Sequence, residues 1–453
     1  MTKGLFVQKG SKAGFFSASD THKEPKVWGE EHWIVNKEYC GKKLLVKKNR
    51  RCSVHLHKEK DEVFYLQSGK VLLEIEHESY TMMPGDYAHI PPGTKHRFTG
   101  LEDSEIMEFS TEHREEDSFR HELSGHAEPE RYARQSALLQ NFSQQNILVI
   151  GDIMLDAYTE GSVERISPEA PVPVLSSCTR RFVPGGAGNV AANICALGGS
   201  VRVLSVCGGD SAAQQLRDLC AAHHIAVHFV TDQSRRTTVK ERIVDTRARQ
   251  QIVRIDTEDT QPICEEIERQ LLALLSAQQT VSSSGAILLS DYAKGVLTPR
   301  LFEHIYTLAE RHEIPVLVDP KPHGSDYLSH LKRAAIVTPN TSEAQQLAGA
   351  GVDTPFLGQV VSQQVSGSVL WTRGAKGVDV CRQGETRFHA DSVACDVVDV
   401  SGAGDTVVSV SALCLAAGAS IEDTADMANR AAGVVVGKHG TATLTPEELD
   451  AVL

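Results

Sequence analysis

The sequence predicts a chain of two domains, an N-terminal all-β domain followed by a doubly wound α/β domain. The 453 residues are too many for one ordinary domain. Residues 25–112 consist of short alternating runs bounded by Gly, Pro and charge, which is typical of a sandwich or small barrel. From residue 146 onward, apolar runs typical of buried parallel strands alternate with helical stretches.

The change in sequence texture suggests where the domains begin and end. We expect an N-terminal extension over 1–24, the β domain over 25–112, a partly helical linker over 113–143 and the α/β domain over 144–453. The linker is polar and nearly free of β-branched residues, so an extra helix packed on either domain is an equally good interpretation.

Composition excludes several classes of protein. The chain is 41% hydrophobic and 23% charged, as globular proteins are, and no stretch approaches 18 consecutive apolar residues, so we expect no membrane span. The N-terminus lacks the apolar stretch of a secretory signal, and ten scattered cysteines without a CxxC pair suit a reducing cytoplasm. A net charge of −13 argues against nucleic-acid binding.

In the α/β part, polar side chains directly follow the expected strands. Asp291, Asp319, Asn340 and Thr372 come after the runs AILLS, PVLV, AAIVTP and SVLW. Open α/β sheets bind their ligands at these carboxyl ends. The stretches 171–182 and 237–256 do not fit the alternation and look like hairpins, so we expect a small accessory sheet over the site.

The sharpest signal is VVDVSGAGDTVVS, residues 397–409. A Gly-rich turn that leads into a helix points backbone N–H groups and a positive dipole end at an anion. Asp405 in that turn would repel phosphate, so it is better placed to accept a proton from an attacking hydroxyl. The pattern therefore indicates phosphoryl transfer, and its alternative is a plain N-cap Asp after a Gly turn.

Further segments carry a family resemblance. GD at 151–152, PGGAGNVAAN, N-x-x-E at 340–343, TRGAKG and DVSGAGDT, in this order, resemble the ribokinase-like (phosphofructokinase-B) sugar kinases. GDIMLDAY, ERISPEAPVPV, SDYAKGVLT and AAGVVVGKHGTATLTPEEL are similar to the kinase half of the bacterial bifunctional heptose enzymes. Those enzymes phosphorylate D-glycero-β-D-manno-heptose 7-phosphate at O1 on the route to ADP-heptose for lipopolysaccharide. Their adenylyltransferase domain has no counterpart before Leu453, so we expect nucleotidyl transfer to occur elsewhere.

The resemblance implies a role for each matching position. Asp405 would deprotonate the anomeric hydroxyl, and the backbone N–H groups of Gly402, Ala403 and Gly404 would hold the transferring phosphoryl group. ATP and Mg²⁺ would lie against Asn340, Thr341, Ser342, Glu343 (through water), Thr372, Arg373 and Gly374. The sugar would face Asp152, Asp156, Gly185, Gly186 and Asn189, with Asp291 nearby. Its phosphate needs a cation, for which Lys294, Arg249 and Lys321 are candidates, although each could equally be a solvated surface group. The family's lid often makes a dimer contact, so we expect a homodimer.

The N-terminal part contains a metal-ligand pattern. His55 and His57 flank one residue, which places both imidazoles on one face of a strand, and Glu62 follows. Gly85, Pro91, Gly93 and His96 then complete the two motifs of the cupins, although Asn49 and Gly100 replace two motif residues that are not ligands. Three histidines and a carboxylate suit Fe²⁺, Mn²⁺, Ni²⁺, Co²⁺ or Zn²⁺. The alternative is a metal-free cupin with histidines that are satisfied structurally.

The role of this metal is left open between two hypotheses. The segment 26–75 resembles cupins of the mannose-6-phosphate isomerase type, in which a metal helps to move a proton between C1 and C2 of a phosphorylated sugar. An isomerase fused to a kinase would catalyse neighbouring steps, and Arg51, Lys95 and Arg97 near the expected mouth could hold a phosphate. The competing hypothesis is a sugar-binding or dimerising cupin without turnover.

Overall fold

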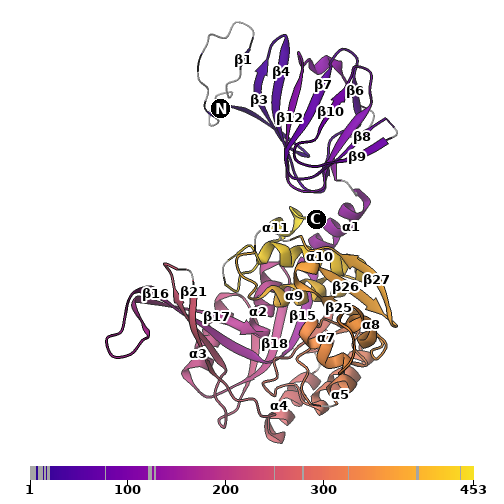
Figure 1. The fold of residues 1–453 in the computed structure, drawn as a ribbon. Coiled ribbons are helices and arrows are strands. Elements are labelled where there is room, and N and C mark those ends of the chain that lie inside the picture. Colours follow the sequence, from indigo (N-terminus) through magenta and orange to yellow (C-terminus); the bar gives the residue numbers. More distant parts are fainter. Residues whose placement is uncertain are drawn as a thin grey trace. The chain divides into compact units, whose positions relative to one another are not determined.

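The chain divides into two compact units, Met1–Arg134 and Gln135–Leu453 (Figure 1). The structure is a computed structural model that describes residues 7–8, 14, 17, 21–76, 78–120, 125–126, 129–248, 250–277, 280–324, 326–393, 397–438 and 440–453. Arg249, one of the candidate cations, lies outside the described residues. No helix of the described chain has the length and apolar character that a membrane span requires.

The N-terminal unit is all-β, as expected, and contains two sheets. The first has the order β1 (Val7–Gln8), β3 (Gly29–Asn36), β4 (Tyr39–Val46), β12 (Ser104–Thr111), β7 (Glu62–Ser68), β10 (Tyr87–Ile90), with β2 (His22–Lys26) paired to β3. The second has the order β13 (Ser118–Arg120), β6 (His55–His57), β11 (His96–Gly100), β5 (Arg50–Arg51), β14 (Gly125–His126), and β8 (Val71–Ile75) pairs with both β11 and β9 (Glu78–Met82). A core that includes Trp28, Leu66 and Phe98 is buried in this unit.

Part of the expected linker belongs to this β structure. Residues 118–120 form β13, which pairs with β6 so that Phe119 lies opposite Leu56. The carboxylate of Asp117 accepts hydrogen bonds from the backbone N–H groups of Lys58, Glu59 and Lys60 at 2.9–3.2 Å. These bonds tie the stretch to the turn after β6, although its composition is not typical of a strand.

The helical part of the expected linker is α1 (Pro129–Asn141). The amide of Gln135 donates to Asp423 and Asp426 of α10 (Ile421–Val435) at 3.3 and 3.0 Å. The C-terminal half of α1 therefore packs on the α/β unit, which is one of the two arrangements that the sequence left open.

The C-terminal unit is the expected α/β domain. Its main sheet has the order β19 (Ala226–Thr231), β18 (Ser200–Cys207), β15 (Asn146–Gly151), β22 (Ala286–Ser290), β23 (Val316–Asp319), β24 (Ile336–Val337), β25 (Ser368–Thr372), β26 (Val378–Arg382), β27 (Glu385–Ala390). The strands from β19 to β25 run parallel, and β26 and β27 are antiparallel. The parallel strands are nearly continuous apolar runs because both of their faces are buried.

Helices cover both faces of the main sheet. The core shared with β15 and β22 includes residues of α4 (Glu265–Ser276), α5 (Pro299–Arg311), α6 (Tyr327–Leu331), α7 (Thr341–Ala348) and α8 (Leu357–Ser362). Elsewhere α9 (Ala403–Ala416) packs against α2 (Ala187–Ala196) and α10. The remaining helices are α3 (Ser211–Ala222) and α11 (Pro446–Asp450), and the 3-10 turns are η1 (Glu115–Asp117), η2 (Phe142–Gln144), η3 (Thr354–Phe356) and η4 (Gly374–Lys376).

A second, four-stranded sheet accounts for the two irregular hairpin stretches. Its order is β17 (Pro173–Gly186), β16 (Ile153–Ile166), β20 (Val239–Asp245), β21 (Gln250–Thr257), and we call it the lid sheet. It projects from one side of the α/β unit (Figure 1). Because β16 follows β15 after only Asp152, the lid sheet begins at the carboxyl end of the main sheet, where ligands bind.

Candidate functional site

The turn before α9 presents free backbone donors at the N-terminus of a helix. Gly402 adopts a φ of +82°, a left-handed conformation that suits glycine, and α9 begins at the next residue. The N–H of Ala403 donates to the carbonyl of Val400 at 3.3 Å. Within the described chain, the N–H groups of Gly404 and Asp405 have no hydrogen-bond partner, and the space around Gly404 is open. The free donors at this helix end within the described chain are therefore those of Gly402, Gly404 and Asp405, whereas the N–H of Ala403 is already used.

Asp405 is held from two sides. Its carboxylate accepts hydrogen bonds from Asn189 Nδ2 of α2 and from the hydroxyl of Tyr292, each at 2.5 Å. Burial raises the pKa of Asp405, and these two hydrogen bonds and the charge of Lys240 act in the opposite direction. Burial and the proximity of Asp405 raise the pKa of Tyr292, which therefore stays a donor. The two hydrogen bonds thus fix the position of the carboxylate at the N-terminus of α9.

The glycines that precede Asn189, Gly185 and Gly186, allow the backbone before α2 to lie close to Asp152 and Asp156. A Cβ at Gly185 would lie 2.7 Å from Asp156 Oδ2, and one at Gly186 would lie 2.5 Å from the carbonyl of Asp152. These glycines therefore permit close packing. Asn193, one turn along α2 from Asn189, accepts from Thr406 Oγ1 at 3.2 Å and acts in helix packing.

Asp152 is fully engaged with the backbone. Its carboxylate accepts hydrogen bonds from the N–H groups of Tyr292, Lys294 and Val296 at 2.8–3.1 Å, and its side chain is buried. The sequence suggested a contact with the sugar for this residue. In the structure its three backbone hydrogen bonds fix the loop that carries Tyr292. A buried carboxylate with three backbone donors has little capacity left for a ligand.

The remaining sugar-side candidates have partners as well. Asp156 is buried and forms an ion pair with Arg242 at 2.7 Å. Asp291 accepts from the Tyr327 hydroxyl at 2.6 Å, and burial together with the charge of Asp152 raises the pKa of Asp291 to about 6.

Both described lysines among the three candidate cations are paired with a glutamate. Lys294 Nζ lies 2.8 Å from Glu258, and Lys321 Nζ lies 3.1 Å from Glu343. The third candidate, Arg249, lies outside the described residues.

A cavity of about 900 Å³ lies beside the turn before α9. Most of the residues expected on the nucleotide side line it, namely Asn340, Thr341, Ser342, Thr372, Arg373 and Gly374, together with Ala403 and Gly404. The sequence reasoning missed the apolar part of its wall, formed by Val378, Val397, Val400, Val407, by Ala432 and Gly433 of α10 and by Val436 directly after α10. A polar end next to free N–H groups and an apolar end suit a nucleotide.

Several nucleotide-side residues also have structural tasks. Asn340 caps α7 by accepting from the N–H of Glu343 at 3.0 Å, and Glu343 accepts from the N–H of Asn340 at 3.0 Å. Glu343 does not line the cavity. The guanidinium of Arg373 donates to Asp379 at 2.5 Å, which fixes it at the cavity wall.

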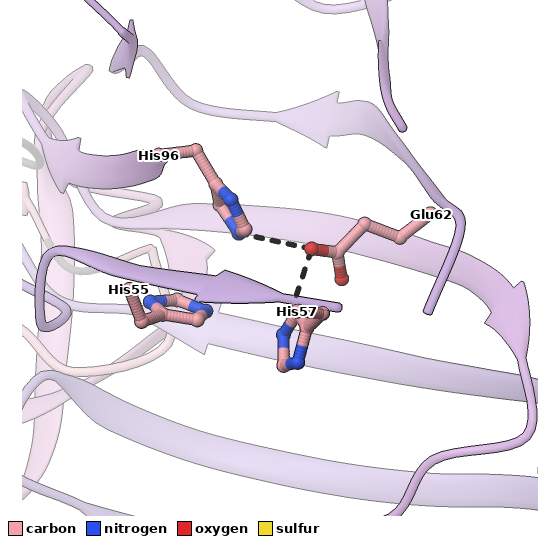
Figure 2. Close-up of side chains that lie close together, drawn as sticks. All are labelled: His55, His57, Glu62 and His96. Carbon is pink, nitrogen blue, oxygen red and sulfur yellow. Dashed lines mark ion pairs between the residues drawn. The ribbon is translucent and has the colours of Figure 1, made fainter. Parts of the chain in front are cut away.

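In the N-terminal unit, the four expected metal ligands come together (Figure 2). His55 and His57 of β6 and His96 of β11 belong to one sheet, and Glu62 at the start of β7 belongs to the other. One possible ligand atom from each residue lies within 4.8 Å of the others. His55 pairs directly with His96 across β6 and β11, so strand register places both imidazoles on one face.

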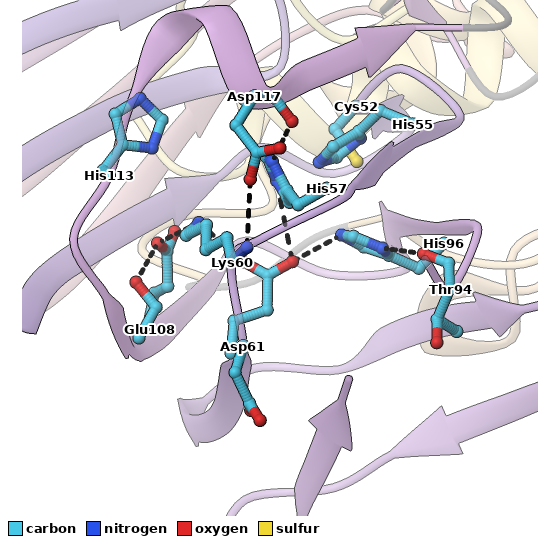
Figure 3. A network of polar contacts seen from close by, with 12 residues as sticks. Cys52, His55, His57, Lys60, Asp61, Thr94, His96, Glu108, His113 and Asp117 are labelled. Carbon is cyan, nitrogen blue, oxygen red and sulfur yellow. Dashed lines mark hydrogen bonds and ion pairs between the residues drawn. The ribbon is translucent and has the colours of Figure 1, made fainter. Parts of the chain in front are cut away.

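Backbone carbonyls fix the orientation of all three imidazoles (Figure 3). The Nδ1 atoms of His55, His57 and His96 donate to the carbonyls of Ser53, Asp117 and Thr94 at 2.8, 3.0 and 3.1 Å. A carbonyl only accepts, so each Nδ1 carries the hydrogen and each Nε2 presents a lone pair to the cluster. Burial lowers the pKa of His55 to about 3 and also lowers that of His57, so both imidazoles are neutral at neutral pH.

Two buried acceptors face each other in this cluster. His96 Nε2 lies 2.9 Å from Glu62 Oε1, and within the described chain neither atom has a well-formed hydrogen bond. A cation between two such lone pairs would satisfy both, so the donor set fits a divalent metal. Burial alone would raise the pKa of Glu62, but the charge of Lys60 lowers it.

Three residues of the cluster, His55, His57 and Glu62, line the wall of a cavity of about 540 Å³. Lys60, also on this wall, is buried and contacts Glu62 at 2.7 Å and Glu108 at 2.6 Å (Figure 3). Of the three cations expected near the mouth (Arg51, Lys95 and Arg97), none lines this cavity, and Arg97 makes two hydrogen bonds to Glu74.

Comparisons with known proteins identify both units. Residues 144–448 match the pfkB family carbohydrate kinase model, and residues 44–111 match the cupin domain model. The chain is 42% identical over 313 residues to "Bifunctional protein HldE" of Azorhizobium caulinodans and 41% identical over 325 residues to that of Pectobacterium atrosepticum. These matches cover 68% and 69% of this chain, and in both cases 64% of the relative's length.

The same domain fold occurs in solved structures. Phosphofructokinase-2 from Escherichia coli in complex with potassium superposes with a TM-score of 0.57 and 20% identity, covering 68% of this chain and 97% of that one. Arabidopsis thaliana ribokinase complexed with ribose and ATP gives 0.52 and 20%, covering 67% and 97%. The chain belongs to the pfkB family of carbohydrate kinases. It is a sugar kinase that also carries an N-terminal cupin domain.

Proposed function

We propose that the α/β domain transfers the γ-phosphoryl group of ATP to O1 of D-glycero-β-D-manno-heptose 7-phosphate, which gives the 1,7-bisphosphate. The observation that carries this proposal is the position of Asp405. It lies at the N-terminus of α9, held by Asn189 and Tyr292, next to the free N–H groups of Gly402 and Gly404 and a nucleotide-sized cavity. The choice of this substrate rests on the resemblance to the bifunctional heptose enzymes, and the identity of 41–42% to the HldE relatives over the kinase domain supports it.

In the proposed reaction, Asp405 accepts the proton of the O1 hydroxyl. O1 attacks the γ-phosphorus, the bond from that phosphorus to the oxygen bridging the β-phosphate breaks, and ADP leaves. The N–H groups of Gly404 and Asp405 stabilise the charge on the transferring oxygens. Mg²⁺ would neutralise phosphate charge, and Asn340 and Glu343 would organise it, Glu343 through water.

An ATP-consumption screen over heptose, hexose and pentose phosphates tests the substrate. We expect heptose 7-phosphate to be turned over with a higher kcat/KM than fructose 6-phosphate or ribose. A higher kcat/KM for either of those two sugars would show that the substrate assignment is wrong, although the sugar kinase class would stand.

For the cupin we propose a divalent transition metal on His55, His57, Glu62 and His96, and isomerisation of a phosphosugar. The unsatisfied pair Glu62–His96, of which Glu62 lies on the wall of a cavity, supports this proposal. A bound divalent ion would polarise a sugar oxygen in that cavity. The alternative, a binding or dimerising module, gains weight from the pairing of Lys60 with glutamates.

Isomerase activity can be separated from the binding alternative with the full-length protein. We would measure bound metal and then test sedoheptulose 7-phosphate and fructose 6-phosphate for aldose–ketose conversion without ATP. Bound metal together with conversion supports the isomerase. Bound metal without conversion of any phosphosugar leaves the binding module.

We further propose a homodimer formed through the lid sheet. Several apolar side chains of this sheet and its hairpin are exposed, namely Ile166, Val172, Ile252, Val253 and Ile255. Exposed apolar side chains of this kind are typical of a protein interface. Light scattering of the wild type and of Val253→Asp tests this, since the charge should yield monomers.

A further inference from the structure

The lid sheet carries a row of arginines across its strands. Tyr158 of β16 is paired with Arg181 of β17 and with Arg242 of β20, and Arg242 is paired with Arg254 of β21. Directly paired residues project from the same face of a sheet. These four side chains therefore form one row on one face, and we call it the arginine row.

This face is the one that looks toward Asp405. Asp156 precedes Tyr158 by two residues, so it lies on the same face, and its partner on β20 is Lys240. Lys240 Nζ lies 5.6 Å from the centre of the Tyr292 ring, and Tyr292 donates to Asp405. The arginine row is thus about 7 Å beyond the Asp156 row, since each residue of a strand advances by about 3.3 Å.

The donors of the row are only partly used. The Arg181 guanidinium lies 4.2 Å from the centre of the Tyr158 ring, and that of Arg242 lies 5.2 Å from it. Arg242 also pairs with Asp156 at 2.7 Å, whereas the carboxylate nearest to Arg181 is Glu160 at 3.6 Å, too far for a hydrogen bond. The Tyr158 hydroxyl is buried and has no hydrogen-bond partner among the described residues.

A short chain segment links the row to the turn before α9. A Cβ at Gly440 would lie 3.5 Å from Arg181 Nη2 and 3.8 Å from the Tyr158 hydroxyl. Asp399 accepts hydrogen bonds from the N–H groups of Gly440 at 3.0 Å and of Ser401 at 2.9 Å. Since Ser401 directly precedes Gly402, the row and the phosphoryl-binding turn border the same site.

We propose that Arg181, Tyr158 and Arg242 bind the phosphate that the acceptor sugar already carries. This inference rests on the proposed kinase function. It names the side chains that would make the enzyme select a phosphorylated sugar as its substrate. Two guanidinium groups with a hydroxyl between them match the oxygens of a phosphate. Seen from Asp405, the row lies beyond Asp156, as a phosphate at the end of the sugar remote from O1 requires. The described lysines considered for this role, Lys294 and Lys321, are already paired with glutamates.

Arg181→Gln and Arg242→Gln test the subsite, with Arg180→Gln as the matched control. Arg180 is the neighbour of Arg181 on the same strand, but it points to the opposite face, where it bonds to Thr159 and Glu241. For each variant we would measure kcat/KM with heptose 7-phosphate and with the same heptose lacking the phosphate, and the KM for ATP. Calorimetric binding of heptose 7-phosphate and a thermal melt complete the set.

We expect Arg181→Gln to lower kcat/KM for heptose 7-phosphate by about 10- to 100-fold through KM. The value for the unphosphorylated heptose and the KM for ATP should not change, and Arg180→Gln should behave as the wild type. If both row variants keep the wild-type preference for the phosphorylated sugar, the subsite is wrong while the kinase function stands. If the wild type neither binds nor prefers the phosphorylated sugar, the proposed function itself fails.

Discussion

The hydroxyl of Tyr292 lies 2.5 Å from Oδ1 of Asp405, on the side of the carboxylate opposite to Asn189. Burial raises the pKa of Asp405, and the hydrogen bond from Tyr292 works against that rise. A base must be ionised to accept a proton. Tyr292 therefore keeps Asp405 functional at lower pH than burial alone would allow.

Tyr292→Phe should consequently raise the pKa of Asp405. The acidic limb of the pH profile of kcat should move to higher pH, and kcat at neutral pH should fall by about 10-fold. Tyr306→Phe, which removes a hydroxyl bonded to the carbonyl of His330, should leave the profile unchanged. An acidic limb at the wild-type position in Tyr292→Phe would show that this contact does not tune the base.

Asp152→Ala should destabilise the α/β domain by about 3–5 kcal/mol, because three buried N–H groups lose their acceptor. Chemical denaturation measures this loss, and Asp152→Asn should cost less because its carbonyl still accepts. An unchanged unfolding free energy with a raised KM for the sugar would instead support the direct sugar contact that the sequence suggested.

The cupin cluster should hold about one equivalent of a divalent transition metal per chain. His96→Gln should lose it, whereas His89→Gln should retain it, because His89 is an exposed histidine paired with Asp61. Elemental analysis of the purified proteins measures the metal content. A chelator should lower the melting temperature of the wild type, because removing the bound metal removes its stabilisation of the folded state. Equal metal content in both variants would contradict the assignment.

The apolar part of the large cavity should select the nucleotide. Ala432→Phe on α10 would fill this part of the cavity, so the KM for ATP should rise by about 10-fold or more. Calorimetric binding of the sugar should stay at the wild-type value. A weakened affinity for the sugar with an unchanged KM for ATP would show that the cavity holds the acceptor instead.

The sequence predicted those features that depend on local pattern. Strand–helix alternation identified the α/β fold, and the spacing of His55, His57, Glu62 and His96 identified a cluster that the structure brings together. The GAGD turn likewise located Asp405 at a helix N-terminus, because its glycines and its apolar helix are contiguous in the chain.

Features that depend on strand register or distant partners could not be predicted. Arg181 and Arg242 meet on Tyr158 only because three strands pair in one register, which their sequences do not specify. The sequence left Lys294 and Lys321 as candidates for binding the sugar phosphate. Only the three-dimensional structure shows that each of them is paired with a glutamate. The contact between His57 Nδ1 and the backbone carbonyl of Asp117 could not be predicted either, because any residue has such a carbonyl and the sequence placed Asp117 in a linker.

The most direct test of the central claim is ³¹P NMR of the product formed from heptose 7-phosphate and MgATP by the wild type and by Asp405→Asn. We predict a new anomeric phosphate signal with the wild type. With Asp405→Asn we predict no such signal, although calorimetry should show that ATP still binds. Formation of the 1,7-bisphosphate by Asp405→Asn at a rate near that of the wild type would contradict the role of Asp405 as the base.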